Sequence, residues 1–355
     1  MKAVVLCGGE GTRLRPFTYT QAKHLLPVAG KPVVEHALAA VREAGIRDVA
    51  IVVSPSVEGQ FRERFGDGGR IGLRLAYVVQ PEARGLAHAV LCAEAYVGNE
   101  PFLVYLGDNL LQGGVTGVVH LFRSQGPSAV VTLRRVEDPR RFGVAVVENG
   151  QLVRLVEKPQ HPPSDLAIVG AYAFTPLLFQ AAREVKPSFR GELELTDCLQ
   201  WLIDRGHAVL PYEVPGWWQD VGRPSDLLVA NRLLLAQLEL RVEGEVDKAS
   251  TIEGPVVIER GARVLGSRVI GPVVIGEEAM VERSALGPNV AVGPRAVVCG
   301  AEVTDSILMD GARVEGRTRL VGSVLGCGVR VQMSTRRACS ALLSDESALQ
   351  VKEEG

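Results

Sequence analysis

Near its N-terminus the chain has the sequence AVVLCGGEGTRLRP over residues 3–16. The apolar run Ala3–Cys7 has the length and the β-branched content of a strand, and a glycine-rich turn follows it. Such a turn at the carboxyl end of a parallel strand lets backbone N–H groups approach a phosphate closely. It is not a Walker A loop, and Leu14 stands where a GxGxxG motif needs its third glycine. Because Arg13 and Lys23 follow it closely, we expect a phosphate-binding turn.

Short apolar runs alternate with segments of helical periodicity from this stretch to about Leu240. We expect strands at 3–7, 49–53, 73–79 and 102–106 and helices at 33–43, 59–65 and 86–95. This alternation is typical of parallel βαβ units in an α/β domain. Residues 144–173 are richer in strand patterns, which suggests a mixed-sheet part. Residues 224–240 predict a closing helix, and 241–248 look like a polar connector.

A different pattern begins at about Thr251. Aliphatic residues recur six positions apart, with small, polar and Gly-rich positions between them. They are Ile252, Ile258, Val264 and Ile270, then Ile275 and Val281 after a slip of one residue, and later Val314 and Leu320. This spacing is typical of a left-handed parallel β-helix with hexapeptide repeats, and an ordinary β-sandwich is the alternative. We therefore predict two domains, at residues 1–243 and 244–355.

Composition and charge limit the classes of function that the chain could have. The net charge of −2 offers no broad basic surface for nucleic acid or an anionic membrane, and no stretch of about twenty apolar residues suits a membrane span. The six cysteines are scattered without a CxxC motif, which favours reduced thiols in a cytoplasmic protein over disulfides or a zinc site. The run Ala3–Cys7 is also too short for the core of a signal peptide. A phosphorylated substrate would need a few well-placed cations.

Ten short motifs occur in one order before about Leu240. They are GGEGTRL at 8–14, KHLLP at 23–27, GKP at 30–32, QP at 80–81, GLAHA at 85–89, LGDN at 106–109, FGV at 142–144, VEKP at 156–159, RGELE at 190–194 and WQDVG at 218–222. Together they resemble the signature of sugar nucleotidylyltransferases. The residues within these motifs are most similar to those of the long-form glucose-1-phosphate thymidylyltransferases, which add a C-terminal β-helix. The resemblance implies a Rossmann-like nucleotidyltransferase domain with a mixed, mostly parallel sheet.

The resemblance also implies a catalytic set of five residues. Asp108 and Asp220 would be magnesium ligands, although a strand-end aspartate taken alone is more often an Asx turn or a helix cap. Arg13 and Lys23 would hold the triphosphate, and Lys158 would hold the phosphate of the hexose. Each of these cations taken alone could be a solvated surface charge.

Further contacts implied by the resemblance divide between the two substrates. The nucleotide would be bound by Leu6, Gly8, Gly9, Gly11, Thr12, Gln80, Pro81, Gly85 and Asp108. The sugar phosphate would be bound by Asn109, Gly143, Glu157, Lys158, Tyr172 and Arg190. Within these sets, Gln80 would bond the edge of the base and Glu157 would accept hydrogen bonds from the hexose hydroxyls.

The activity implied is magnesium-dependent transfer of a nucleotidyl group from dTTP to α-D-glucose 1-phosphate, with in-line attack on the α-phosphorus and release of pyrophosphate. A sister enzyme that uses UTP, another triphosphate or another hexose is an alternative, as is a bifunctional enzyme with a C-terminal acyltransferase. Many hexapeptide β-helices transfer acyl groups with a histidine base, but the last histidine here is His207, before the repeats. We therefore expect a structural β-helix that favours a homo-oligomer. A non-catalytic subunit is disfavoured because all five charged residues are present.

Overall fold

The computed structural model describes residues 1–333 and 337–351. Contacts within the chain define two compact units. The first holds Met1–Glu10 and Val33–Asp220, and the second holds Gly11–Pro32 and the described residues from Val221 onward. The segment Gly11–Pro32 therefore groups with the C-terminal part of the chain, although it follows the first strand in sequence.

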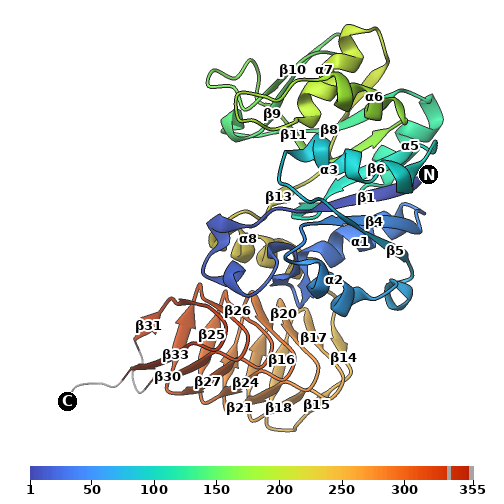
Figure 1. Cartoon of the computed structure of the whole chain (residues 1–355). Coiled ribbons are helices and arrows are strands. Elements are labelled where there is room, and N and C mark those ends of the chain that lie inside the picture. Colours follow the sequence, from blue (N-terminus) through green and yellow to red (C-terminus); the bar gives the residue numbers. More distant parts are fainter. Residues whose placement is uncertain (334–336, 352–355) are drawn as a thin grey trace. The chain divides into compact units, whose positions relative to one another are not determined.

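A nine-stranded sheet forms the centre of the first unit (Figure 1). Its strands are β1 (Lys2–Cys7), β4 (Asp48–Val53), β5 (Arg74–Val79), β6 (Phe102–Leu106), β8 (Ala129–Arg135), β9 (Gly143–Glu148), β10 (Gln151–Glu157), β11 (Leu166–Phe174) and β12 (Val209–Glu213). The order is β10-β9-β11-β6-β1-β4-β5, with β8 beside β11 and β12 beside β8. Neighbours among β6, β1, β4 and β5 are parallel, whereas β11 is antiparallel to β6, β8 and β9. The expected mixed, Rossmann-like sheet is confirmed.

Helices connect and cover these strands. They are α1 (Val33–Glu43), α2 (Glu58–Phe65), α3 (Leu86–Cys92), α4 (Glu94–Val97), α5 (Thr116–Gln125), α6 (Leu177–Glu184) and α7 (Leu195–Asp204). Apolar side chains of α3, α6 and α7 share one core with Val4, Val104 and Phe174 of the sheet. The single helix expected at 86–95 is wrong, because the backbone leaves helical geometry at the buried Ala93 and α4 starts anew. Within the described ranges, no helix has the length and apolar character needed to span a membrane.

The carboxyl ends of β1 and β6 lie side by side at one edge of the sheet. Leu6 pairs with Leu106, and the Gly107 N–H donates to the Leu6 carbonyl at 2.9 Å. The turns that begin at Gly8 and Gly107 therefore leave the sheet together. Ligands of open α/β sheets bind at this edge, so it is the place to look for a site.

The second unit is built on three parallel sheets. One holds β14 (Arg241–Val242), β17 (Val256–Ile258), β20 (Val273–Ile275), β23 (Val290–Val292), β26 (Ile307–Leu308), β29 (Val324–Leu325) and β32 (Leu342–Leu343). The next holds β15 (Glu245–Val246), β18 (Arg263–Leu265), β21 (Met280–Glu282), β24 (Val297–Cys299), β27 (Arg313–Gly316), β30 (Arg330–Met333) and β33 (Ala348–Val351). The last holds β16 (Thr251–Glu253), β19 (Arg268–Ile270), β22 (Ala285–Leu286), β25 (Glu302–Thr304), β28 (Arg319–Val321) and β31 (Ala338–Cys339). Successive strands visit the three sheets in turn, which is the arrangement of a parallel β-helix and excludes the β-sandwich.

The aliphatic repeat lines the inside of this β-helix, with two departures from expectation. Ile258, Val264 and most of the other predicted positions lie in one buried core. In β19, however, Val269 points inward in place of Ile270, because the repeat slips by one residue there. The connector expected at 241–248 is also wrong. Its polar residues form β14 and β15, the first strands of the β-helix, whose outer surface is exposed.

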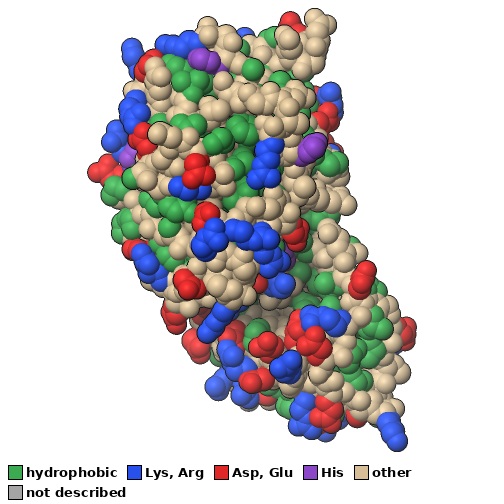
Figure 2. Space-filling model, turned by 90° about the vertical axis from the view of Figure 1, so that its right-hand side faces the viewer, with side chains coloured by type: hydrophobic (Ala, Val, Ile, Leu, Met, Phe, Trp, Pro, Cys, Tyr) green, Lys and Arg blue, Asp and Glu red, His purple; other side chains and the backbone are tan. Residues whose placement is uncertain are grey.

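Charged side chains cover the outside of the β-helix, where Figure 2 shows basic and acidic groups interspersed. Several pairs join neighbouring rungs, for example Arg263 with Glu245 at 3.1 Å and Arg268 with Glu253 at 3.3 Å. Exposed pairs of this kind contribute little individually, about 0–1 kcal/mol. The stability of the β-helix therefore comes mainly from its aliphatic core.

Candidate active site

Two carboxylates meet around one amide just beyond β6. The strand β7 (Asn109–Leu111) pairs antiparallel with β13 (Trp218–Asp220), which places Asn109 opposite Asp220. Asn109 Nδ2 donates to Asp108 Oδ1 at 2.8 Å and to Asp220 Oδ1 at 3.4 Å. Both carboxylates are half-buried. Because like charges this close repel each other, a cation bound between them would stabilise the pair.

The orientation of the Asn109 amide is fixed from its other side. Trp218 Nε1 donates to Asn109 Oδ1 at 2.6 Å, so the amide nitrogen faces the carboxylates. Gly170 of β11 makes room for this side chain, since a Cβ atom there would lie 2.7 Å from the Cβ of Asn109. Asn109 is itself buried. The amide therefore holds the two aspartates in a defined geometry.

This donor set fits a magnesium ion. Magnesium prefers hard oxygen ligands and is commonly held by one or two carboxylates, with waters and substrate phosphates completing its shell. No cluster of three or more His, Cys, Asp or Glu side chains suited to a metal occurs in the part of the chain that the structure describes. A site that relies on Asp108 and Asp220 would thus leave positions for phosphate oxygens.

A second group of predicted residues gathers around Gln80, at the end of β5. Gln80 Nε2 lies 3.2 Å from the Gly85 carbonyl and 3.1 Å from His88 Nδ1. A Cβ atom at Gly8 would lie 2.7 Å from Gln80 Oε1, so the first turn approaches this amide closely. Gly85 has φ +99°, and a Cβ there would lie 2.5 Å from the Leu193 carbonyl. Gly85 is therefore required for this packing, and Gly8 leaves room for the Gln80 amide.

Other predicted nucleotide contacts in the first unit lie along the same edge. Leu6 is buried at the end of β1, whereas Gly9 and Pro81 are exposed in the turns that follow β1 and β5. The structure thus brings the residues predicted to face the base to one edge of the sheet.

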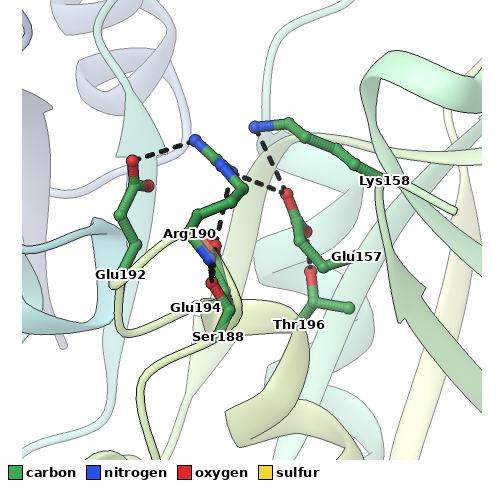
Figure 3. A network of polar contacts seen from close by, with 7 residues as sticks. All are labelled: Glu157, Lys158, Ser188, Arg190, Glu192, Glu194 and Thr196. Carbon is green, nitrogen blue, oxygen red and sulfur yellow. Dashed lines mark hydrogen bonds and ion pairs between the residues drawn. The ribbon is translucent and has the colours of Figure 1, made fainter.

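A network of ion pairs surrounds Glu157, at the end of β10 (Figure 3). Glu157 Oε1 lies 3.4 Å from Lys158 Nζ and 3.6 Å from a terminal nitrogen of Arg190. Thr196 Oγ1 donates to Glu157 Oε2 at 2.6 Å. Gly143 allows this contact, since a Cβ there would lie 2.7 Å from Thr196 Oγ1. Four predicted sugar-phosphate residues therefore lie together, namely the charged Glu157, Lys158 and Arg190, and Gly143 beside them.

Arg190 is shared among further carboxylates of the same network. Its guanidinium lies 2.9 Å from Glu192 Oε1 and 3.3 Å from Glu194 Oε1, and Ser188 Oγ donates to Glu194 Oε1 at 3.0 Å. Burial, and then the negative charge of Glu157, raises the pKa of Glu194 above its ordinary value. The Arg190 side chain is 28% exposed and stays reachable by a ligand.

A series of contacts connects the Glu157 network with the aspartate pair. Lys158 has a left-handed backbone with φ +40°, and its N–H donates to the Phe142 carbonyl at 3.0 Å. The Phe142 ring meets the edge of Trp218 at 5.0 Å between centroids. Since Trp218 also bonds Asn109, the aspartate pair and the Glu157 network are parts of one packed structure.

Tyr172 has a different environment from the other predicted sugar contacts. Its ring is buried in the core of the first unit and stacks on Phe174 at 5.8 Å between centroids. Burial raises the pKa of the Tyr172 hydroxyl. The neutral phenol is therefore maintained at physiological pH.

The remaining predicted residues belong to the second unit. Gly11 has φ +66° and begins a short 3₁₀ turn, Thr12–Leu14, that carries the exposed Arg13. A Cβ atom at Gly11 would lie 2.9 Å from the Cβ of Lys23, so this turn packs against the backbone that carries Lys23. Thr12 is exposed beside Arg13. These four residues form a compact loop of their own.

Sequence patterns did not indicate the supporting roles of Trp218, Thr196 and Glu194. Trp218 and Glu194 lie inside recognised motifs, so the motifs marked them without showing what they contact. Thr196 follows the RGELE motif by two residues. Its bond to Glu157 depends on the packing of α7 against β10.

Comparison with known proteins agrees with this geometry. A family model described as nucleotidyl transferase matches residues 2–237. The chain belongs to the nucleotidyl transferase family. It is 48% identical over 271 residues to a glucose-1-phosphate thymidylyltransferase of Streptomyces griseus, covering 76% of each chain.

Two solved structures resemble the transferase. One is a protein of Bacillus anthracis assigned as a glucose-1-phosphate thymidylyltransferase, in complex with sucrose. It is 39% identical with a TM-score of 0.63, covering 66% of this chain and 94% of that one. The other is a UDP-glucose pyrophosphorylase complexed with UDP-glucose, 30% identical with a TM-score of 0.59, covering 66% and 98%. The chain therefore carries out nucleotidyl transfer to a sugar 1-phosphate, as its motifs predicted.

Proposed function

We propose that this transferase joins dTTP to α-D-glucose 1-phosphate, with magnesium as cofactor, to give dTDP-glucose and pyrophosphate. The relative from Streptomyces griseus is named glucose-1-phosphate thymidylyltransferase, and the match covers 76% of this chain. The observation that carries the proposal is the pair Asp108 and Asp220 held by one amide. Phosphoryl transfer needs positioning and charge neutralisation more than covalent chemistry, and this pair could supply both through a metal.

Magnesium bound by Asp108 and Asp220 would neutralise charge on the triphosphate. Arg13 and Lys23 would hold the phosphates of the same nucleotide. The phosphate oxygen of the hexose would attack the α-phosphorus in line as the bond to pyrophosphate breaks. The role of the protein is then to align two anions that repel each other in water.

The Glu157 network suits binding of the second anion. Without ligand, Glu157 neutralises Lys158 and Arg190. A hexose phosphate would take over these two cations, and the carboxylate of Glu157 would become available to the sugar hydroxyls. Charge-assisted hydrogen bonds of this kind are short and strong, so the exchange gives both affinity and orientation.

A second candidate is the same reaction with UTP. The solved pyrophosphorylase carries UDP-glucose, and thymine differs from uracil by one methyl group. A single methyl contact typically distinguishes ligands by about 1–3 kcal/mol, so a Gln80 that bonds the pyrimidine edge would accept both bases. We infer that dTTP is preferred and that UTP is used at a lower rate.

A matrix assay tests the assignment. Pyrophosphate release is measured for dTTP, UTP, ATP and GTP against several hexose 1-phosphates, with and without magnesium. The expected result is the highest kcat/KM for dTTP with glucose 1-phosphate, and no turnover when magnesium is chelated. A preference for a purine triphosphate would contradict the thymidylyl assignment, and activity in chelator would contradict the metal.

A further inference from the structure

An apolar stripe runs along the outside of the β-helix, where charged residues are the rule. Val257, Val274 and Ala291 pair with one another in β17, β20 and β23. The inward side chains of these strands fill the core, so these three residues face outward, and yet each is at most 5% exposed. Some other part of the second unit must therefore cover them.

The cover is the loop that carries Arg13 and Lys23, together with a helix. β2 (Pro27–Val28) and β3 (Lys31–Pro32) form a hairpin whose tip is Ala29-Gly30. Ala29 shares a buried cluster with the stripe and with Leu235 of α8 (Pro224–Leu235). At Gly30, a Cβ atom would lie 3.3 Å from Val274, so the tip touches the stripe directly.

The hairpin tip is held in an unusual conformation. Ala29 and Gly30 have φ +47° and +81°, the left-handed pair of a type I′ turn. A left-handed alanine is costly and persists only where its surroundings fix it. Asn231 of α8 provides that constraint, since its Oδ1 accepts from the Ala29 N–H at 2.9 Å.

Asn231 bonds the β-helix with the other end of its amide. Its Nδ2 donates to the Asn289 carbonyl at 3.2 Å, and the side chain is fully buried. The neighbouring Arg232 forms an ion pair with Asp305, which fastens α8 to a later rung. One buried amide therefore links the loop, the helix and the β-helix.

A second contact fixes the loop before Lys23. Thr20 Oγ1 donates to Asp345 Oδ2 at 2.6 Å, and Gln21 Nε2 lies 3.7 Å from Cys327 Sγ. The Asp345 carboxylate is oriented in turn by the Cys327 N–H at 2.8 Å. Lys23 thus lies between two attachments to the β-helix, one at residues 20–21 and one at the hairpin tip.

We propose that the β-helix positions the triphosphate-binding loop and that Asn231 is the central positioning residue. The proposal rests on the function proposed above, in that it takes Arg13 and Lys23 to bind the triphosphate. The repeats then serve nucleotide affinity directly, in addition to any role in subunit association. Removing the Asn231 amide frees the hairpin tip, and the two cations lose their defined place.

Steady-state kinetics of the full chain with Asn231→Ala test this. We expect the KM for dTTP to rise about tenfold, while the KM for glucose 1-phosphate changes less than about twofold, because a misplaced binding group mainly costs affinity for its own ligand. Asn231→Asp keeps the acceptor for Ala29 but loses the donor to the Asn289 carbonyl, so it should recover only part of the affinity. Val298→Ala, which removes a buried side chain of the β-helix core away from the loop, is the control for lost stability.

Hydrogen exchange supplies a readout independent of turnover. The Ala29 amide should be protected in the wild type and in Asn231→Asp, and it should exchange rapidly in Asn231→Ala. If Asn231→Ala does not fold, Thr20→Val probes the other attachment, with a rise of about twofold to fivefold in the KM for dTTP. Equal rises in both KM values, or the same rise in Val298→Ala, would overturn the positioning role.

Calorimetric titration of dTTP with magnesium separates this proposal from the proposed function. If the wild type binds dTTP but transfers nothing to glucose 1-phosphate, the assigned reaction fails, and weaker dTTP binding by Asn231→Ala still supports the positioning role. If Asn231→Ala binds dTTP as tightly as the wild type, the positioning role fails whatever the reaction.

Discussion

The two sets of cations predicted to bind phosphate are held in opposite ways. Lys158 and Arg190 are partly exposed and lie in a network of carboxylates centred on Glu157. Arg13 and Lys23 lie on a loop that is fixed at the hairpin tip by a buried neutral hydrogen bond and apolar packing, and near Thr20 by a bond to the Asp345 carboxylate. The first arrangement neutralises charge that a ligand can take over. The second fixes the backbone that carries the two cations.

The energetic consequences differ in the same way. A phosphate that displaces Glu157 replaces one anion by another at Lys158 and Arg190, whose side chains are 36% and 28% exposed, so the exchange costs little. A buried amide that loses its partner costs about 1–3 kcal/mol, so the hairpin tip resists displacement. A hexose phosphate therefore exchanges with Glu157 at ion pairs that are easily replaced. The triphosphate-binding loop, in contrast, is positioned by buried contacts that are costly to break.

Asp108→Asn should have the largest effect on activity. Asp108 belongs to neither of the two cation sets. We expect turnover to fall by at least ~10²-fold while the fold is kept, because one preorganised electrostatic group is typically worth that much. The loss should appear in kcat at saturating substrates and magnesium, whereas changes in either cation set should appear in KM. Asp204→Asn, at an exposed position on α7, is the control. Turnover near that of the wild type would remove Asp108 from the metal site.

Lys158→Ala tests the Glu157 network, in which a phosphate is proposed to displace the carboxylate. A bound phosphate that loses a charged partner forfeits about 1.5–3 kcal/mol, so the KM for glucose 1-phosphate should rise more than tenfold. The KM for dTTP should change much less, the reverse of the pattern expected for Asn231→Ala. Lys186→Ala removes an exposed lysine from the same unit as a control. A shift confined to the dTTP constant would show that Lys158 serves the nucleotide.

Gln80→Ala should have a smaller effect, on the base alone. We expect the KM values for dTTP and UTP to rise together, by the equivalent of about 1 kcal/mol, because the amide bonds an edge that both pyrimidines share. The preference for dTTP over UTP should persist, since Gln80 does not read the methyl group. Loss of that preference in the variant would assign Gln80 to the methyl contact.

Much of this architecture was predictable because it depends on local periodicity. Short apolar runs and helical periodicity located β1, β4, β6 and α1, and the six-residue repeat identified the β-helix. The slip was placed one position too late because Val269 and Ile270 are both aliphatic, and the first rung at 241–248 was missed because its exposed strands carry a weak hydrophobic signal.

Long-range placement could not be predicted in the same way. Asn109 and Asp220 stand 111 residues apart, and their contact depends on the pairing of β7 with β13. The grouping of Gly11–Pro32 with the β-helix gave no sequence signal either. In hindsight, Asn231 is the residue that could have been noticed, as a polar side chain within the apolar face of α8. A buried amide in such a position must have partners, although sequence alone does not name them.

The smallest expected effect is on protein stability and concerns an acidic residue near the Glu157 network. Burial, and then the charge of Glu157, raises the pKa of Asp197 above its ordinary value of 3.8. As pH rises from 3.8 to the raised pKa, the unfolded chain releases this proton before the folded protein does. The free energy of unfolding should therefore fall across that window, by about 1 kcal/mol or less from this group.

Urea unfolding of Asp197→Asn between pH 4 and pH 7 measures this contribution. The variant should lose less stability than the wild type as the pH rises, and Asp204→Asn on the same helix should follow the wild type. Glu157→Gln should reduce the wild-type slope as well, because it removes the second cause of the raised pKa. A steeper fall in Asp197→Asn than in the wild type would mean that the carboxylate is stabilised in the folded protein. In that case cations would neutralise the acids around Glu157 more fully than the structure indicates. Displacing Glu157 from Lys158 and Arg190 would then cost a phosphate more binding free energy.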